Sequence, residues 1–304
     1  MAAEIAAGGI TVPLSHPDKV LFPDDGITKE DLARYYADVA DRMLPWLRDR
    51  PITMVRYPDG LGGQRFFQKN APSYFPDWIH RAEVGKEGGQ VEQVVCDRPA
   101  TLVYLANQAC IEIHAFTSRV DKLGAPDQMV FDFDPPDDER FADVRRAALW
   151  ARDLLEGELG LTSFVRTTGG RGLHVHVALN RRTDFDAVRE FAHRAAGVLA
   201  RRHPDVITTE QRKDKRGDRV YADVMRNAYA QTVVASYGVR ARAGAPVATP
   251  LSWAEVEDEG LEPGRFTMAT VRAGLGAAED AWAGFTAARH GLGEAGKRLA
   301  KLDA

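Results

Sequence analysis

Apolar and polar residues alternate along the chain in a pattern that predicts a mixture of strands and helices. Residues 128–135 (QMVFDFDP) form a compact apolar run that predicts a buried strand. Residues 138–159 place apolar side chains at helical spacing, which predicts an amphipathic helix. A second such helix is expected over 184–203, capped by Thr183 or Asp184. Strands are also expected within 162–179, around a glycine turn, and over 218–227 and 232–242.

The N-terminal part of the chain is less regular. Residues 27–47 predict a helix, because Thr28 is a good N-cap and Asp31 follows at the spacing of a capping box. Strands are expected at 51–60 and 64–72, and a short helix leading into a strand at 100–116. The tail from 277 to 302 predicts a helix with a glycine break. Steady βα alternation and a dinucleotide-binding glycine fingerprint are both missing from the sequence, so the expected class is α+β.

Composition narrows the class of protein. The chain has 304 residues, 44% hydrophobic and 28% charged, as in an ordinary globular protein. No apolar run is long enough to span a bilayer, and the first residues lack the pattern of a secretory signal. Cys96 and Cys110 have no metal-type spacing, which favours the reducing cytoplasm. A net charge of -4 counts against a protein that coats nucleic acid nonspecifically, but it is compatible with a local basic groove.

Two carboxylates end the strand at 128–135. Asp132 and Asp134 are two residues apart, so both side chains lie on one face. Two like charges this close are costly unless a cation joins them. The first interpretation is therefore a divalent metal site, for which oxygen ligands of this kind suit Mg²⁺ or Mn²⁺. The alternative is a strand whose end faces water.

The glycine turn at 168–172 is the second candidate. Its glycines would allow a tight turn whose N–H groups cradle a phosphate, and Arg171 would add charge. His174 and His176 then alternate with valines on one face of the following strand. The alternative for this histidine pair is a set of buried or surface histidines with ordinary hydrogen-bond partners.

Asp223 is the third candidate, because it lies inside an apolar strand. Its alternative role is an ion pair with a neighbour such as Arg226. Two acids from one strand and one from another can hold two metals, which activate an attacking oxygen and stabilise a leaving oxygen in phosphoryl transfer.

These three motifs, FDFDPP, TTGGRGLHVHV and VYADVMRN, resemble those of the archaeo-eukaryotic primase superfamily. Most closely they resemble the polymerase domain of bacterial ATP-dependent DNA ligase D and its stand-alone relatives. The likeness extends to HPDKVLFPDDGITKEDLARYY, RFFQK, IEIHAF and SYGVRAR. It implies a primase-type fold of antiparallel sheets flanked by helices with a small N-terminal module. We expect a single domain, with an end-binding part (1–110), a catalytic core (111–270) and a helical tail (271–304).

The resemblance also implies roles for individual residues. Asp132, Asp134 and Asp223 would be the catalytic carboxylates and would hold two Mn²⁺ or Mg²⁺ ions. The nucleoside triphosphate would be bound by His114, Thr168, Gly170, Arg171, His174, Arg240 and Phe67. Relatives often have Ser and Lys at the positions of Thr168 and Arg171, an exchange that would alter the triphosphate geometry.

DNA contacts are implied in the flanks. Lys19 and Lys29 match a pocket for a downstream 5′-phosphate, although the position near His16 often holds a small amide in relatives. Phe66 and Phe67 match an aromatic step on which a base stacks, and core packing is the alternative for one of the two. Further DNA contacts are expected from Arg56, Lys69, Lys213 and Arg216.

The implied activity is addition of nucleotides, with ribonucleotides preferred, to a DNA 3′-hydroxyl at gaps or breaks during non-homologous end joining. The resemblance also implies the partners: gapped or broken DNA with a 5′-phosphate, a Ku-type end binder and a separate ligase. No K-x-D-G ligase motif occurs in the chain, so ligation is not expected of it. The expected location is the bacterial cytoplasm, at the nucleoid, with no membrane contact. The alternatives are a metal-dependent nuclease or phosphodiesterase and a catalytically silent DNA-end-binding module.

Overall fold

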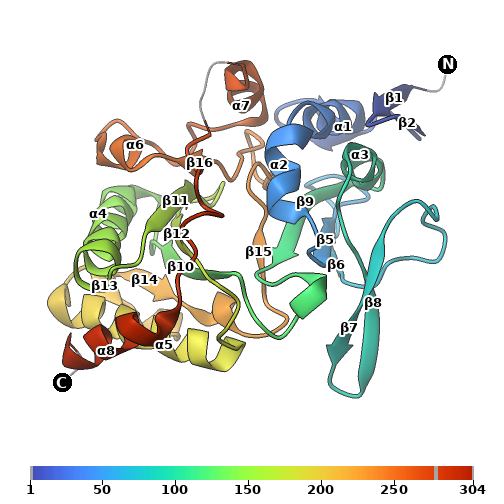
Figure 1. The fold of residues 1–304 in the computed structure, drawn as a ribbon. Coiled ribbons are helices and arrows are strands. Elements are labelled where there is room, and N and C mark those ends of the chain that lie inside the picture. The colour runs from blue at the N-terminus through green and yellow to red at the C-terminus, as the bar shows by residue number, and fades with distance from the viewer. Residues whose placement is uncertain (1–2, 277–279, 303–304) are drawn as a thin grey trace. The chain divides into compact units, whose positions relative to one another are not determined.

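The computed structural model describes residues 3–276 and 280–302, which divide into two compact units (Figure 1). The first unit comprises Met1–Asp121, Thr232–Ala248 and Phe266–Ala278, and the second comprises Lys122–Gln231, Thr249–Arg265 and Glu279–Ala304. The first unit therefore includes Thr232–Ala248, which was expected in the catalytic core, and Phe266–Ala278, which was expected partly in the core and partly in the tail. The functional division into 1–110, 111–270 and 271–304 stays a prediction.

A four-stranded sheet organises the first unit. Its strand order is β15-β9-β5-β6, and all neighbours are antiparallel. The strands are β5 (Ile52–Arg56), β6 (Phe66–Gln68), β9 (Cys110–Phe116) and β15 (Thr232–Val234). Short hairpins surround it: β1 (Glu4–Ala7) with β2 (Ile10–Pro13), β3 (Val20–Phe22) with β4 (Ile27–Thr28), and β7 (Arg81–Lys86) with β8 (Gly89–Val94).

Four helices complete the first unit: α1 (Lys29–Asp38), α2 (Ala40–Leu47), α3 (Pro99–Asn107) and α7 (Met268–Gly274). The α1 helix starts where the sequence predicts, because the Thr28 side chain accepts from the Asp31 amide while Asp31 binds back to the Thr28 N–H. Buried tyrosines of α1 tie it to the rest of the unit. The Tyr35 hydroxyl donates to the Tyr237 carbonyl and the Tyr36 hydroxyl to the Ile111 carbonyl.

A six-stranded sheet organises the second unit, in the order β13-β14-β10-β12-β11-β16. Every neighbouring pair is antiparallel except β13 with β14, which is parallel. The strands are β10 (Gln128–Asp134), β11 (Ser163–Thr167), β12 (Leu173–Ala178), β13 (Ile207–Thr208), β14 (Val220–Asp223) and β16 (Pro250–Leu251).

Helices α4 (Phe141–Arg152) and α5 (Phe185–Arg202) contact the central strand β10. Their buried apolar residues include Val144 and Ala148 on α4 and Val188 and Phe191 on α5. The last turn of α4 widens into a π-helical segment, Asp153–Glu158. Asp184 caps α5 by accepting from the Ala187 amide. Helices α6 (Trp253–Glu257) and α8 (Leu292–Leu302) complete the unit (Figure 1).

The α+β class with antiparallel sheets is confirmed, but several element bounds were wrong. The helix expected over 27–47 is two helices that meet at Val39. The strand expected over 232–242 ends at Val234, since the chain turns and Tyr237 adopts a positive φ of 65°. Of the expected tail helix only α8 forms within the described residues, and 277–279 lie outside them. No helix in the described ranges is long and apolar enough to cross a membrane.

Candidate active site

Four side chains form a row across the sheet of the second unit. Arg166 on β11 pairs with His174 on β12, which pairs with Asp132 on β10, which pairs with Asp223 on β14. Directly paired residues of antiparallel strands point to the same face, so the row presents one guanidinium, one imidazole and two carboxylates. Asp134 follows Asp132 on the same face of β10.

The row is buried at its centre. Asp132 is 6% exposed and His174 is 4% exposed, so the interpretation of this strand end as water-facing was wrong for Asp132. His174 Nε2 lies 3.2 Å from Asp132 Oδ1, and His174 Nδ1 lies 3.0 Å from an Arg166 guanidinium nitrogen. Because a guanidinium can only donate, Nδ1 accepts, and the proton of the neutral imidazole is therefore on Nε2, the nitrogen nearer Asp132.

The carboxylates of the row repel one another. Burial, followed by the charges of Asp132 and Asp223, raises the pKa of Asp134 to about 7. Burial also raises the pKa of Asp223, against the opposing effect of a hydrogen bond from the Met225 amide. The positive charge of Arg226, whose Nε lies 3.9 Å from Asp132 Oδ2, offsets part of this repulsion. The charge of Arg226 therefore stabilises the ionised form of Asp132 as well as that of Asp223, its neighbour in the sequence.

The carboxylates of Asp132, Asp134 and Asp223 suit a hard divalent cation, because their ligand atoms are all oxygen and nearby positive charge balances their negative charge only in part. Their oxygens do not converge on one point. Among the described residues, no three His, Cys, Asp or Glu side chains are grouped closely enough to hold an ion. One oxygen of Asp223 instead accepts the Met225 amide at 2.7 Å.

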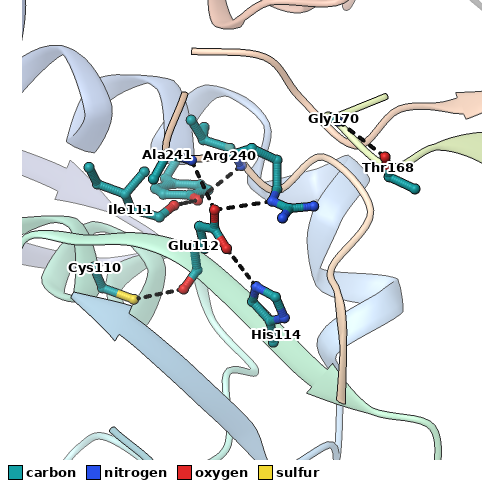
Figure 2. A network of polar contacts seen from close by, with 10 residues as sticks. Cys110, Ile111, Glu112, His114, Thr168, Gly170, Arg240 and Ala241 are labelled. Carbon is teal, nitrogen blue, oxygen red and sulfur yellow. Dashed lines mark hydrogen bonds and ion pairs between the residues drawn. The ribbon is translucent and has the colours of Figure 1, made fainter. Parts of the chain in front are cut away.

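The glycine turn lies between β11 and β12. Thr168 Oγ1 accepts from the amide of Gly170 at 3.1 Å (Figure 2) and from the amide of Gly172 at 3.2 Å. Two of the N–H groups expected to cradle a phosphate are thus bound to Thr168. The Arg171 Nε lies 3.4 Å from Asp138, with the Arg171 side chain 38% exposed. His176, by contrast, is a buried histidine paired with the Gln128 side chain at 3.0 Å, the ordinary alternative for this position.

The loop before β14 folds around arginines. The Arg216 guanidinium lies 3.7 Å from the ring centroid of Tyr221 and donates to the carbonyls of Glu210 and Gln211. Its charge also reduces the rise in the pKa of Asp134 that burial causes. Lys213 is exposed at the tip of this loop. Any DNA contact of Arg216 would therefore compete with its bonds inside the loop.

A buried carboxylate in the first unit, Glu112, was missed by the sequence analysis. Glu112 on β9 binds His114 Nε2 at 2.8 Å, Arg240 Nε at 3.1 Å and the Ala241 amide at 3.0 Å (Figure 2). Burial opposes its ionisation, but the hydrogen bond from His114 and the charge of Arg240 lower the pKa of Glu112 to about 2. The available signal was an acid two residues before His114 in an otherwise apolar strand.

An open pocket in the first unit brings together the lysines expected to bind a 5′-phosphate. Its lining includes Ser15, His16, Lys19, Lys29, Arg56 and Asn107. Lys29 is 6% exposed, and its Nζ donates to the Ser15 carbonyl at 2.5 Å. Burial, and then the charge of Lys19, lowers the pKa of Lys29. The sequence analysis missed Ser15 and Asn107. The Ser15 amide donates to the Asn107 side-chain oxygen at 2.9 Å, which fixes the segment that accepts from Lys29.

The expected aromatic step is exposed on β6. Phe66 is 46% and Phe67 62% exposed, so the alternative that one of them is a core residue was wrong. The Arg65 guanidinium lies 5.2 Å from the Phe67 ring centroid. Arg56 is the cross-strand partner of Phe66, and Lys69 is exposed just after β6. These side chains are thus available for contact with a ligand.

A largely antiparallel sheet with paired acidic side chains at its centre fits the primase-type fold that the sequence motifs imply, and comparison with known proteins agrees. A model of the LigD primase-polymerase domain matches residues 28–282. The chain belongs to the LigD primase-polymerase domain family.

Two relatives and one solved structure illustrate the likeness. The chain is 33% identical to the bifunctional non-homologous end joining protein LigD of Bacillus subtilis over 84% of its length, which is 41% of the relative. It is 32% identical to the multifunctional protein LigD of Pseudomonas aeruginosa over 98% of its length, but 35% of the relative. The polymerase domain of Mycobacterium tuberculosis ligase D in complex with DNA superimposes with a TM-score of 0.85 at 30% identity, covering 92% of this chain and 99% of that one. The chain thus spans well under half of these two relatives.

Proposed function

We propose that the chain extends a DNA 3′-hydroxyl with nucleoside triphosphates, preferring ribonucleotides, at gaps and broken ends during end joining. The pairing of Asp132 with Asp223, next to Asp134, carries this proposal, because clustered carboxylates can hold the metal ions that stabilise the negative charge of phosphoryl transfer. The family of the chain and the DNA bound to the mycobacterial neighbour support it.

In the proposed reaction the 3′-oxygen attacks the α-phosphorus, the bond to the bridging oxygen breaks, and pyrophosphate leaves. Asp132, Asp134 and Asp223 would hold two Mn²⁺ or Mg²⁺ ions, which when bound lower the pKa of the hydroxyl and offset the phosphate charge. His174, whose Nε2 lies 3.2 Å from Asp132, is proposed to help position Asp132, and Arg166 would fix the tautomer of His174. Asp223 is proposed to help accept the proton of the hydroxyl.

The triphosphate would be bound by cationic and turn residues. Arg171 is partly exposed beside the turn, and Thr168 and Gly170 would exchange their mutual bond for phosphate contacts. His114 and Arg240, oriented by Glu112, are proposed as further nucleotide contacts. Phe67 offers an exposed ring for the base.

The DNA would be held by the pocket of Lys19 and Lys29 at a 5′-phosphate. Arg56, Phe66, Lys69, Lys213 and Arg216 are proposed as the other DNA contacts. A Ku-type end binder and a separate ligase are the proposed partners, and the bacterial nucleoid the proposed location.

Filling of a short gap by the purified chain tests this function. The assay compares rNTP with dNTP, Mn²⁺ with Mg²⁺, and a 5′-phosphate with a 5′-hydroxyl across the gap. Extension that is faster with rNTP and with the 5′-phosphate is expected. Strand shortening without nucleotides would instead establish a nuclease, and tight 5′-phosphate-dependent binding without extension would establish a silent end-binding module.

A further inference from the structure

Tyr74 in the first unit is an exposed aromatic ring whose position is fixed. It is 61% exposed, so most of the ring surface is open to a ligand. Its ring packs edge-on against Phe75 with centroids 5.3 Å apart and planes at 70°. Its hydroxyl lies 3.2 Å from an Arg56 guanidinium nitrogen and 3.4 Å from the Gln108 side-chain oxygen. Both ends of the side chain are therefore held while much of its surface stays open.

The residues that hold Tyr74 are themselves fixed. Phe75 is 2% exposed and packs edge-on against Tyr104 of α3 at 5.0 Å. Arg56 donates from Nε to the Gln108 carbonyl at 2.9 Å and from a terminal nitrogen to the Gln68 side chain at 2.9 Å. Little conformational entropy remains to be lost when a ligand covers the Tyr74 ring, and such preorganisation favours binding.

The position of Tyr74 suggests which ligand covers it. Arg56 and Gln108, its two hydroxyl partners, both line the pocket that contains Lys19 and Lys29. A phosphate bound to those lysines would carry its sugar and base out of the pocket at one of its edges. An aromatic ring is a favourable surface for a nucleobase of any sequence, because every base has a π-face.

We propose that Tyr74 is a stacking platform for the nucleobase of the nucleotide whose 5′-phosphate occupies the Lys19–Lys29 pocket. The proposal rests on the end recognition set out under the proposed function and adds a base subsite to it. Phe66 and Phe67 lie on β6 and are proposed to contact other bases, whereas Tyr74 is joined by hydrogen bonds to two residues of the pocket itself.

A binding cycle on gapped DNA tests the stacking. The protein variants are the parent, Tyr74→Ala and Tyr74→Phe, and the DNA carries either a normal nucleotide or an abasic analogue next to the 5′-phosphate. With the normal end, Tyr74→Ala is expected to weaken binding about 5- to 150-fold, the value of one stacked base. Tyr74→Phe keeps the ring and is expected to lose less than Tyr74→Ala, staying within about fivefold of the parent, since a hydrogen bond of this kind contributes only about 1 kcal/mol.

The abasic end separates stacking from other roles. With it, the parent is expected to bind more weakly, and Tyr74→Ala should have no further effect. An equal loss on both DNAs would overturn the proposal, because Tyr74 would then act only through Arg56. No loss on the normal end would overturn it as well.

Two controls complete the experiment. Tyr229→Ala removes another exposed tyrosine, 41% exposed and packed edge-on against Phe185 at 5.6 Å, and should leave binding unchanged. The parent's preference for a 5′-phosphate over a 5′-hydroxyl is measured in the same assay. Absence of that preference would overturn both the end recognition and the stacking. A retained preference without a base-dependent effect of Tyr74 would overturn the stacking alone.

Discussion

Asp132 on β10 and Asp223 on β14 are paired residues of neighbouring antiparallel strands, so their carboxylates project from the same face of the sheet. On the other side of Asp132 lies His174, 3.2 Å away, and behind it Arg166. This arrangement places negative charge at one end of the row and positive charge at the other. The account of the protein depends on this row.

Neutralising Asp134 should stabilise the folded protein at neutral pH. The pKa of Asp134 is raised to about 7 when folded but lies near 4 when unfolded, so the folded state binds more protons between these values. Its contribution to stability is therefore present below about pH 4 and is lost as the pH rises through about 7. The Asp134→Asn variant should lack this loss, so its free energy of unfolding at pH 8 should exceed that of the parent by at most about 4 kcal/mol.

Chemical denaturation at pH 5 and pH 8 in the presence of a chelator measures this effect. Asp186→Asn, which neutralises an exposed acid on α5, is the control and should behave as the parent does. Identical pH dependence in the parent and Asp134→Asn would contradict the raised pKa.

Glu112 should matter through the two side chains that it orients. Replacing it by Gln keeps the shape but removes the charge that binds His114 and Arg240. A charged hydrogen bond contributes about 1.5–3 kcal/mol, so kcat/KM for the nucleotide should fall roughly 10- to 150-fold. Most of the change should be in KM, because these side chains are proposed to bind the substrate. Steady-state kinetics with varied nucleotide, together with thermal unfolding, would check this, and a fall confined to stability would count against it.

Lys29 should determine recognition of the 5′-phosphate more than Lys19 does. Lys29 is buried with its amine at the pocket, whereas Lys19 is already paired with Asp59 at 3.1 Å. Lys29→Met keeps the apolar stem and should remove most of the preference for a 5′-phosphate, roughly tenfold or more, by losing a charged hydrogen bond. Lys19→Met should cost less. Binding titrations with 5′-phosphate and 5′-hydroxyl DNA measure both, and the reverse ranking would be evidence against the pocket geometry.

Gly172 is required by a close approach of two strands. A Cβ at this position would lie 2.4 Å from the Phe133 carbonyl oxygen, so Gly172→Ala must push β12 away from β10. We expect a loss of about 1–3 kcal/mol in unfolding free energy. Gly197→Ala within α5 meets only the end of Arg201 at 3.5 Å and should instead stabilise by about 0.5–1 kcal/mol. Urea denaturation of both variants would test whether Gly172→Ala lowers the free energy of unfolding while Gly197→Ala raises it.

Local patterns in the sequence predicted the local structure well. The Thr28–Asp31 capping box and the apolar face of α4 depend on residues a few positions apart, so composition and spacing suffice. The common face of Asp132 and Asp134 follows from strand periodicity in the same way.

Long-range relationships were not available from pattern alone. That Asp132 pairs with Asp223 depends on the register of β10 against β14, which tertiary packing sets. The contribution of Asn107 to the Lys29 pocket depends on a bond from α3 to Ser15, far away in sequence. The short length of β15 reflects the turn at Tyr237, a residue type that rarely adopts positive φ.

The central claim is that the carboxylate row performs nucleotide transfer, and one assay tests it directly. Primer extension and pyrophosphate release are measured together for the parent, Asp132→Asn and the surface control Asp186→Asn. We predict one pyrophosphate released for each nucleotide added, at the same rate in the parent and in the control. In Asp132→Asn both should fall at least about a thousandfold, since several kcal/mol of transition-state stabilisation is lost, while its fold is retained. Undiminished extension by Asp132→Asn would contradict the account.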